Sequence, residues 1–184
     1  RQIRALASPA RQEIVDALAA AGPCSVAELS GHVGRPADAL YFHLRKLIGV
    51  GLVVEKQARK SGRHVAAVYD VPGLPRMKYG AGVTGGVERV IGAAVRMGER
   101  DFVRALRNGA ESEGTRREVW GGRVKGWLSA KELVEANRLI DRLSRLVLSG
   151  RPGRGKRAQS LTWVFAPAKP GRVANAAESQ GARR

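Results

Sequence analysis

The chain has 184 residues and is 43% hydrophobic, so it can bury a core and hold one large domain or two small ones. Its formal net charge of +17 lies far outside the range of an ordinary cytosolic enzyme. A single cysteine excludes an intramolecular disulfide and disfavours a structural zinc site, which needs several Cys and His ligands.

The positive charge indicates a polyanionic partner. Nucleic acid is the first candidate and an anionic membrane surface the second, although a genome rich in G and C also favours Arg and Ala and would raise the charge without any partner. The bias is strongest in residues 151–184, which hold 8 basic and 1 acidic side chains. The sequence contains no run of about 18 apolar residues, so it predicts no membrane span.

Two short helices are predicted near the start of the chain. Apolar residues at helical spacing predict the first over residues 8–20, where Ser8 can cap the helix. A Gly-Pro pair then ends it, and the second helix is predicted over residues 25–33. Ser25 and Glu28 have the three-residue spacing of a capping box, in which each side chain bonds the backbone N–H of the other.

A third helix is predicted over about residues 37–48, directly after a Gly-Arg-Pro break. The residues that should face the core recur at helical spacing and are Leu40, Leu44 and Leu47. Consecutive helical residues point about 100° apart, so Tyr41 and Phe42 lie off this apolar face. We therefore expect at least part of this aromatic pair to be exposed.

The pattern then changes to that of a β-hairpin. Residues 52–57 and 64–71 are rich in strand-forming side chains, and the segment ARKSGR between them places Gly62 in the turn. Three basic residues lie at the tip of this hairpin: Arg59, Lys60 and Arg63. Such a cluster is often only solvated, but a basic tip can also contact phosphates or the minor groove.

A Pro-Gly-Leu-Pro break at residues 72–75 predicts a boundary between a domain of residues 1–73 and a second region of residues 74–166. Apolar residues at helical spacing predict two helices in the second region, over residues 83–107 and 129–149. Ser129 and Glu132 form a second capping-box pattern.

The C-terminal end carries weaker signals. LTWVF at residues 161–165 is typical of one short strand. Residues 167–184 are mostly Ala, Gly and polar residues, and we expect them to be disordered. The whole pattern predicts a mainly α fold with a small β-hairpin wing: a winged helix-turn-helix followed by a mostly helical dimerisation or sensor region with a short C-terminal strand.

Three segments carry a resemblance to a known family: ALASPARQEIVDAL, SVAELSGHVG and ALYFHLRKLIGVGLV. With its H-L-x-x-L-x-x-x-G-L-V string, the chain resembles the ArsR-type winged-helix transcriptional regulators over about residues 1–72. The matching positions are Leu6, Pro9, Arg11, Ile14, Leu18, Ala27, Glu28, Leu29, Gly34, His43, Leu44, Leu47, Gly51, Leu52 and Val53. The resemblance implies a dimeric DNA-binding repressor or activator. The metal-sensing branch of that family carries paired cysteines on the recognition helix, and this helix has none, which disfavours metal sensing there.

In a winged helix-turn-helix the third helix enters the major groove, so its exposed side chains and the hairpin tip would contact DNA. The residues expected to do so are Asp38, Tyr41, Phe42, Arg45, Lys46, Arg59, Lys60 and Arg63. Exposed rings can contact thymine methyl groups, and Arg45 can contact guanine or phosphate. Two alternatives stay open: Phe42 could pack against the wing or the first helix, and Asp38 could cap the third helix rather than accept from a cytosine amino group.

Other residues that could carry chemistry lack partners in the sequence. His43 has no carboxylate four residues away and no nearby nucleophile, so we expect it to brace the helix or bond the backbone. We expect Cys24 to be inert. No set of residues supports catalysis, so we expect neither an enzyme nor a metal or cofactor site.

The second region allows two interpretations of its apolar residues. The stripe along the 129–149 helix could pack within one chain or form the seam of a homodimer, and the 83–107 helix could supply that seam instead or as well. Trp120, Trp127 and Trp163 could line a pocket for an unknown small-molecule effector or anchor a small core.

These observations predict a DNA-binding transcriptional regulator that acts as a homodimer on double-stranded DNA, in the cytoplasm with the nucleoid. Its recognition helix at about residues 37–48 would enter the major groove, and its basic wing at about residues 58–64 would contact the backbone or the minor groove. The alternative is a basic architectural or partner-docking winged-helix protein with little sequence specificity, because the third helix begins with two alanines and an acid, which read bases poorly.

Overall fold

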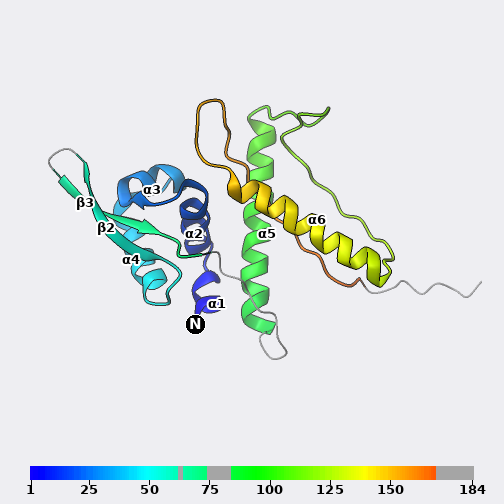
Figure 1. Cartoon of the computed structure of the whole chain (residues 1–184), viewed down its shortest axis with the longest axis horizontal. Coiled ribbons are helices and arrows are strands. Elements are labelled where there is room, and N and C mark those ends of the chain that lie inside the picture. Colours follow the sequence, from blue (N-terminus) through cyan, green and yellow to red (C-terminus); the bar gives the residue numbers. More distant parts are fainter. Residues whose placement is uncertain (62–63, 74–83, 169–184) are drawn as a thin grey trace, which may run out of the picture.

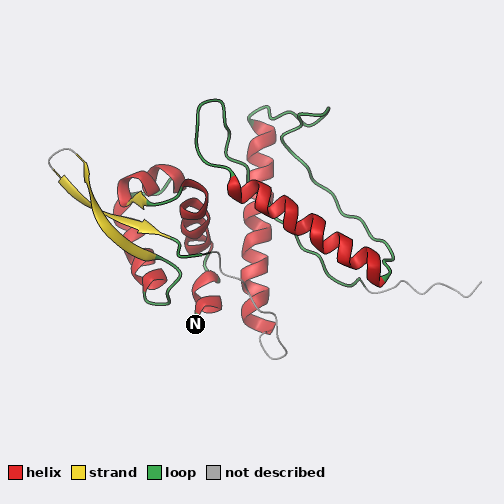
Figure 2. Ribbon diagram, viewed as in Figure 1, coloured by secondary structure: helices red, strands yellow, loops and turns green. Residues whose placement is uncertain are grey.

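A computed structural model describes residues 1–61, 64–73 and 84–168 of the chain (Figure 1). The helices are α1 (Gln2–Leu6), α2 (Pro9–Ala21), α3 (Val26–Val33), α4 (Ala37–Ile48), α5 (Thr84–Arg107) and α6 (Ala130–Ser149). The strands are β1 (Cys24–Ser25), β2 (Val54–Ser61) and β3 (His64–Asp70). The predicted mainly α fold with a small β wing is confirmed, as Figure 2 shows.

Helices α2, α3 and α4 follow the predicted signals closely. The capping box of α3 is present: the Ser25 backbone N–H donates to Glu28 Oε2 at 2.7 Å, and the Glu28 N–H donates to Ser25 Oγ at 3.3 Å. Gly34 ends α3 in the left-handed region at φ 66°, which favours glycine. The three leucines predicted for the core side of α4 are each 0 or 1% exposed. The buried side of α4 therefore holds it against the other helices.

The wing is part of a three-stranded antiparallel sheet in the order β1-β3-β2. Strands β2 and β3 form the expected hairpin, and its turn at residues 62–63, which includes Gly62, lies outside the described residues. The two-residue strand β1 was not predicted, because a segment so short has no periodicity. It pairs Cys24 with Tyr69 and thereby ties the hairpin to the start of α3.

Helix α5 packs against the winged helix. Val90 is 3% exposed and belongs to the same hydrophobic core as α2, α3 and α4. The buried Gln12 of α2 reinforces this contact, because its side-chain Nε2 donates to the carbonyls of Leu6 at 2.6 Å and Val90 at 3.0 Å. The boundary proposed at residues 72–75 stays a prediction, and residues 74–83 lie outside the described residues.

Between α5 and residue 168, the described chain has one further helix and two long irregular segments. Ser129 and Glu132 form the predicted capping box of α6. The strand predicted at residues 161–165 is wrong, since this segment forms no strand. The segment lies against helix α5 and not beside a strand. A Cβ added at Gly98 of α5 would lie 2.7 Å from Thr162 Oγ1. A strand needs a neighbour with free backbone groups, which a helix does not offer. Of the predicted disordered tail, residues 169–184 lie outside the described residues.

Candidate nucleic-acid interface

One side of α4 faces solvent along its whole length. The exposed positions on this side include Asp38, Ala39, Tyr41, Phe42, Arg45 and Lys46. Tyr41 is 47% and Phe42 54% exposed, which confirms that the aromatic pair lies off the leucine side. Five of the eight residues predicted to contact DNA are therefore brought together on one helical surface, which we call the α4 face: Asp38, Tyr41, Phe42, Arg45 and Lys46.

Two side chains of α4 contact the ring of Phe42. The ammonium of Lys46, one turn along the helix, lies 5.7 Å from the ring centroid, and the His43 ring meets it edge-on at 5.5 Å. A cation over an aromatic ring is attracted by the negative face of the ring. Since more than half of Phe42 stays exposed, its ring is available to a ligand of the α4 face.

Asp38 does not cap α4, contrary to one of the two expectations for it. The N-cap residue is Pro36, and no side chain accepts a capping hydrogen bond there. Asp38 lies in the first turn, where its negative charge interacts favourably with the positive end of the helix dipole. Its carboxylate is exposed and can accept a hydrogen bond from a partner.

His43 lies at the edge of the α4 face and is partly buried. Burial lowers the pKa of its imidazole, and the positive charges of Arg11 and Arg35 lower it further. Its Nδ1 is buried and has no hydrogen-bond partner among the described residues. The lowered pKa favours the neutral imidazole, and the ring contacts Phe42 edge-on without a bond from Nδ1 to the backbone of a described residue.

Arg45 and Lys46 form no ion pair with any described residue. Of the wing residues, Arg59 and Lys60 belong to β2, where their backbones pair with Ala66 and Val65 of β3. This register places both close to the end of the hairpin that points away from the helices (Figure 1). Arg63 lies outside the described residues.

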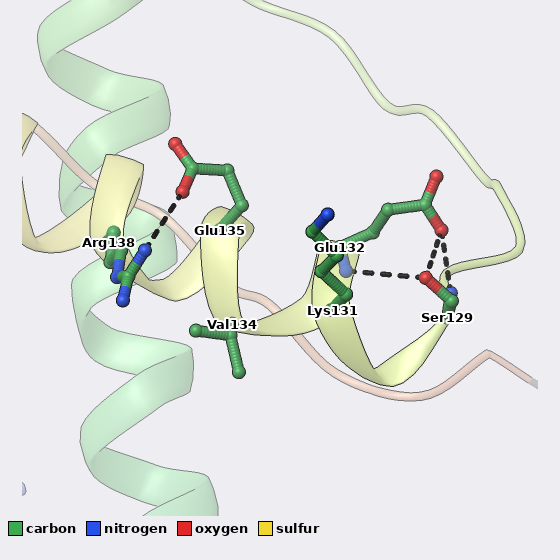
Figure 3. A pocket seen from close by; sticks show the side chains of 6 residues that line it. All are labelled: Ser129, Lys131, Glu132, Val134, Glu135 and Arg138. Atoms are coloured by element: carbon green, nitrogen blue, oxygen red, sulfur yellow. Dashed lines mark hydrogen bonds and ion pairs between the residues drawn. The ribbon is translucent and has the colours of Figure 1, made fainter.

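The rest of the described chain offers no comparable site. No group of three or more His, Cys, Asp or Glu side chains gathers there to hold a metal. A surface hollow of about 870 Å³ is lined by six residues that all belong to the N-terminal half of α6 or its cap, as Figure 3 shows. In the same described ranges, no helix is both long and apolar enough to cross a membrane.

The three tryptophans do not anchor a core, so that expectation is wrong. Trp120, Trp127 and Trp163 are 76%, 81% and 52% exposed, and none of them lines the hollow on α6. The sequence could not predict this exposure, because the identity of an apolar residue does not reveal which residues pack against it.

Comparison with known proteins supports the assignment of the N-terminal elements. Residues 6–56 match the family model of a helix-turn-helix domain, a range that includes α2, α3, α4 and the start of β2. No curated protein matches the chain. The chain therefore carries a helix-turn-helix domain, and α4 is the last helix within the matched range.

Proposed function

We propose that the protein is a DNA-binding transcriptional regulator, not an enzyme, that works in the cytoplasm with the nucleoid. The observation that supports this function is the α4 face, because a helix-turn-helix domain presents there two basic side chains without ion-pair partners among the described residues. The net charge of +17 supplies the long-range attraction to a polyanion. Helix α4 lies in the major groove in this proposal, and the wing lies on the backbone or in the adjacent minor groove.

The side chains of the α4 face divide into three chemical roles. Arg45 donates to guanine O6 and N7 or to a phosphate, and Lys46 donates to a phosphate. Tyr41 and Phe42 contact thymine methyl groups, and Asp38 accepts from a cytosine amino group. On the wing, Arg59, Lys60 and Arg63 contact phosphates. The family resemblance to ArsR-type regulators agrees with these roles.

We also propose that the regulator is a homodimer that forms through α6. Leu139, Leu143 and Leu146 lie at i, i+4 and i+7 on this helix, and we call them the leucine stripe. They are 56%, 47% and 69% exposed, and no described residue of α6 is buried. A 20-residue amphipathic helix gains most of its stability from packing of its apolar side. We therefore expect another apolar surface to pack against the leucine stripe.

Exposed aromatic side chains in the two irregular segments also favour a partner. Trp120, Trp127, Trp163 and Phe165 are 76%, 81%, 52% and 45% exposed. At about 200 Å² for each side chain, they expose roughly 500 Å². One side of a standard protein interface buries about 800 Å². The exposed area of the four aromatic residues and the leucine stripe adds up to about that size, and a second copy of the chain is the partner that a two-fold symmetric DNA site requires.

A second candidate function is a basic architectural protein with little sequence specificity. The start of α4 favours it, because Ala37 and Ala39 cannot hydrogen-bond a base edge and the acidic Asp38 reads bases poorly. Competition between a selected duplex and a random duplex at one salt concentration separates the two candidates. A ratio of affinities near one supports the architectural function.

The α4 face can be tested with the double variant Arg45→Ala and Lys46→Ala. Each phosphate contact contributes about 0.9 to the slope of log affinity against log salt concentration, so we expect the slope to fall by about 1 to 2 and the affinity to fall with it. The measurement is a salt titration of duplex binding by fluorescence anisotropy.

The matched control is Lys131→Ala with Arg138→Ala, which removes the same charge from α6. We expect this control to change the slope by less than the α4 variant does. An equal change in both variants would contradict a specific role of the α4 face.

A further inference from the structure

Glu13 is shared by two arginines that come from different parts of the molecule. Its side chain lies on α2 and is 15% exposed. Arg35 donates from Nε at 3.2 Å and from Nη2 at 3.1 Å to Glu13 Oε2, and Arg100 Nη1 lies 2.7 Å from Glu13 Oε1. Each carboxylate oxygen of Glu13 therefore has its own guanidinium partner.

Arg35 occupies the turn that leads into α4. It lies between Gly34, which ends α3, and Pro36, which is the N-cap of α4. Its carbonyl accepts a hydrogen bond from Ser30 Oγ at 2.6 Å. The turn is therefore held at its backbone by α3 and at its side chain by Glu13 of α2.

Arg100 belongs to α5, which leads into the C-terminal region. The other ion pairs of this part of α5 join Asp101 to Arg100 and Arg104 and stay within the helix. Among the described residues, the contact between Arg100 and Glu13 is the one ion pair that joins α5 to the helix-turn-helix. Glu13 thus connects α5 to the residue that precedes the recognition helix by two positions.

We propose that Glu13 is a positioning residue, which fixes the entry of α4 through Arg35 and couples it to the position of α5 through Arg100. Single exposed ion pairs contribute little, but a mostly buried carboxylate with two guanidinium partners forms a small network of charge-assisted hydrogen bonds. The consequence for DNA rests on the proposed function: α4 lies at a fixed orientation to α5, and through the C-terminal region to a second copy. Two recognition helices must keep such a fixed relation to fit successive major grooves.

The test compares Arg100→Met with Arg104→Met in the full-length chain. Both variants remove one positive charge from α5, and Arg104 lies one turn further along with only a 3.6 Å contact to Asp101 of its own helix. Arg100 is 46% exposed, so its replacement should leave the fold intact. Glu13→Gln removes the charge at the centre of the network, and Arg100→Lys is the conservative variant that should restore part of the coupling.

Two readouts apply to each variant. Backbone amide signals of Arg35 and residues 37–40 should shift in Arg100→Met and Glu13→Gln and stay in place in Arg104→Met. Affinity for a duplex selected from a random pool should fall about threefold or more in Arg100→Met relative to Arg104→Met at the same salt concentration. Arg100→Lys should lie between Arg100→Met and the wild type.

The proposal is overturned if the amide signals stay unchanged in Arg100→Met, if Arg104→Met shifts them equally, or if they shift without a change in affinity. A wild-type protein that selects no duplex would refute the proposed DNA function instead. In that case the amide signals still decide whether Glu13 couples α5 to the start of α4.

Discussion

Asp16 lies on α2, and carboxylates of both α2 and α5 affect its pKa. Burial raises the pKa of Asp16 to about 6, and the nearby carboxylates of Glu13 and Asp101 contribute to the rise. Solvent still reaches one side of Asp16, so water screens part of this effect. Because its pKa in the folded state lies above the ordinary aspartate pKa of 3.8, the folded protein binds this proton more tightly than the unfolded chain does. Its contribution to stability is therefore present at pH 4 and lost as the pH rises through 6.

We expect Asp16→Asn to be more stable than the wild type at pH 7, by about 1 kcal/mol after allowance for solvent screening. The difference should shrink towards zero at pH 4, where Asp16 is protonated in the folded state. Urea unfolding of both proteins at the two pH values measures it, with Glu88→Gln as the control for loss of an exposed carboxylate. Equal free energies of unfolding at pH 7 would show that the ionised Asp16 side chain does not destabilise the folded protein.

At the same scale, the sequence predicted some local features and left others open. The rotation of about 100° per residue was sufficient to place Tyr41 and Phe42 on the surface. It could not decide whether Asp38 caps α4, because the cap depends on where the helix begins. The ion pairs of Glu13 with Arg35 and Arg100 join residues 22 and 87 positions apart, and no local pattern marks such contacts.

Among the elements, those with a strong local signal were predicted and those that depend on a neighbour were not. Helix α6 has both an apolar stripe and a capping box, and its predicted bounds lie within a residue of the observed ones. Helix α1 and strand β1 have 5 and 2 residues, too few for a periodic pattern. The segment LTWVF has the composition of a strand, but it lies against α5, where there is no strand to pair with.

Gly98 of α5 allows this segment to approach the helix closely. A Cβ at this position would lie 2.8 Å from Thr162 Cβ, closer than real side chains come. Glycine within a helix costs about 1 kcal/mol relative to alanine, so alanine should stabilise α5 wherever it fits. At Gly92 the nearest atom is the mobile guanidinium end of Arg96, at 3.3 Å.

We therefore expect Gly92→Ala to stabilise the protein by up to about 1 kcal/mol and Gly98→Ala to give no such gain, because the new methyl group displaces Thr162. Thermal and urea unfolding of the two variants measure the difference. Equal stabilisation by both substitutions would contradict the packing of residues 161–165 on α5.

At the scale of the whole molecule, the two regions of the protein differ in how much of their apolar surface is buried. The N-terminal helices bury their leucines in one core, whereas most of the large exposed hydrophobic side chains lie on α5, on α6 and in the two irregular segments. The sequence predicted the amphipathic pattern of α6 but left open whether its apolar side packs within one chain. In the structure Ala136, Ile140 and Val147 of the apolar side are partly buried within the chain, whereas the leucine stripe remains exposed, which favours contact of the stripe with a second copy.

The most direct test of a dimeric DNA-binding regulator is selection of bound duplexes from a random pool, with the wild type and with Leu139→Glu plus Leu146→Glu. The wild type should enrich two inverted half-sites with centres about 10 base pairs, or a multiple of that, apart, because two α4 helices related by a two-fold axis read successive major grooves. The double variant should sediment as a monomer and enrich one half-site with weaker affinity, while Asn137→Glu, which adds charge off the leucine stripe, should behave as the wild type. A wild-type protein that enriches no sequence over the starting pool would contradict the account.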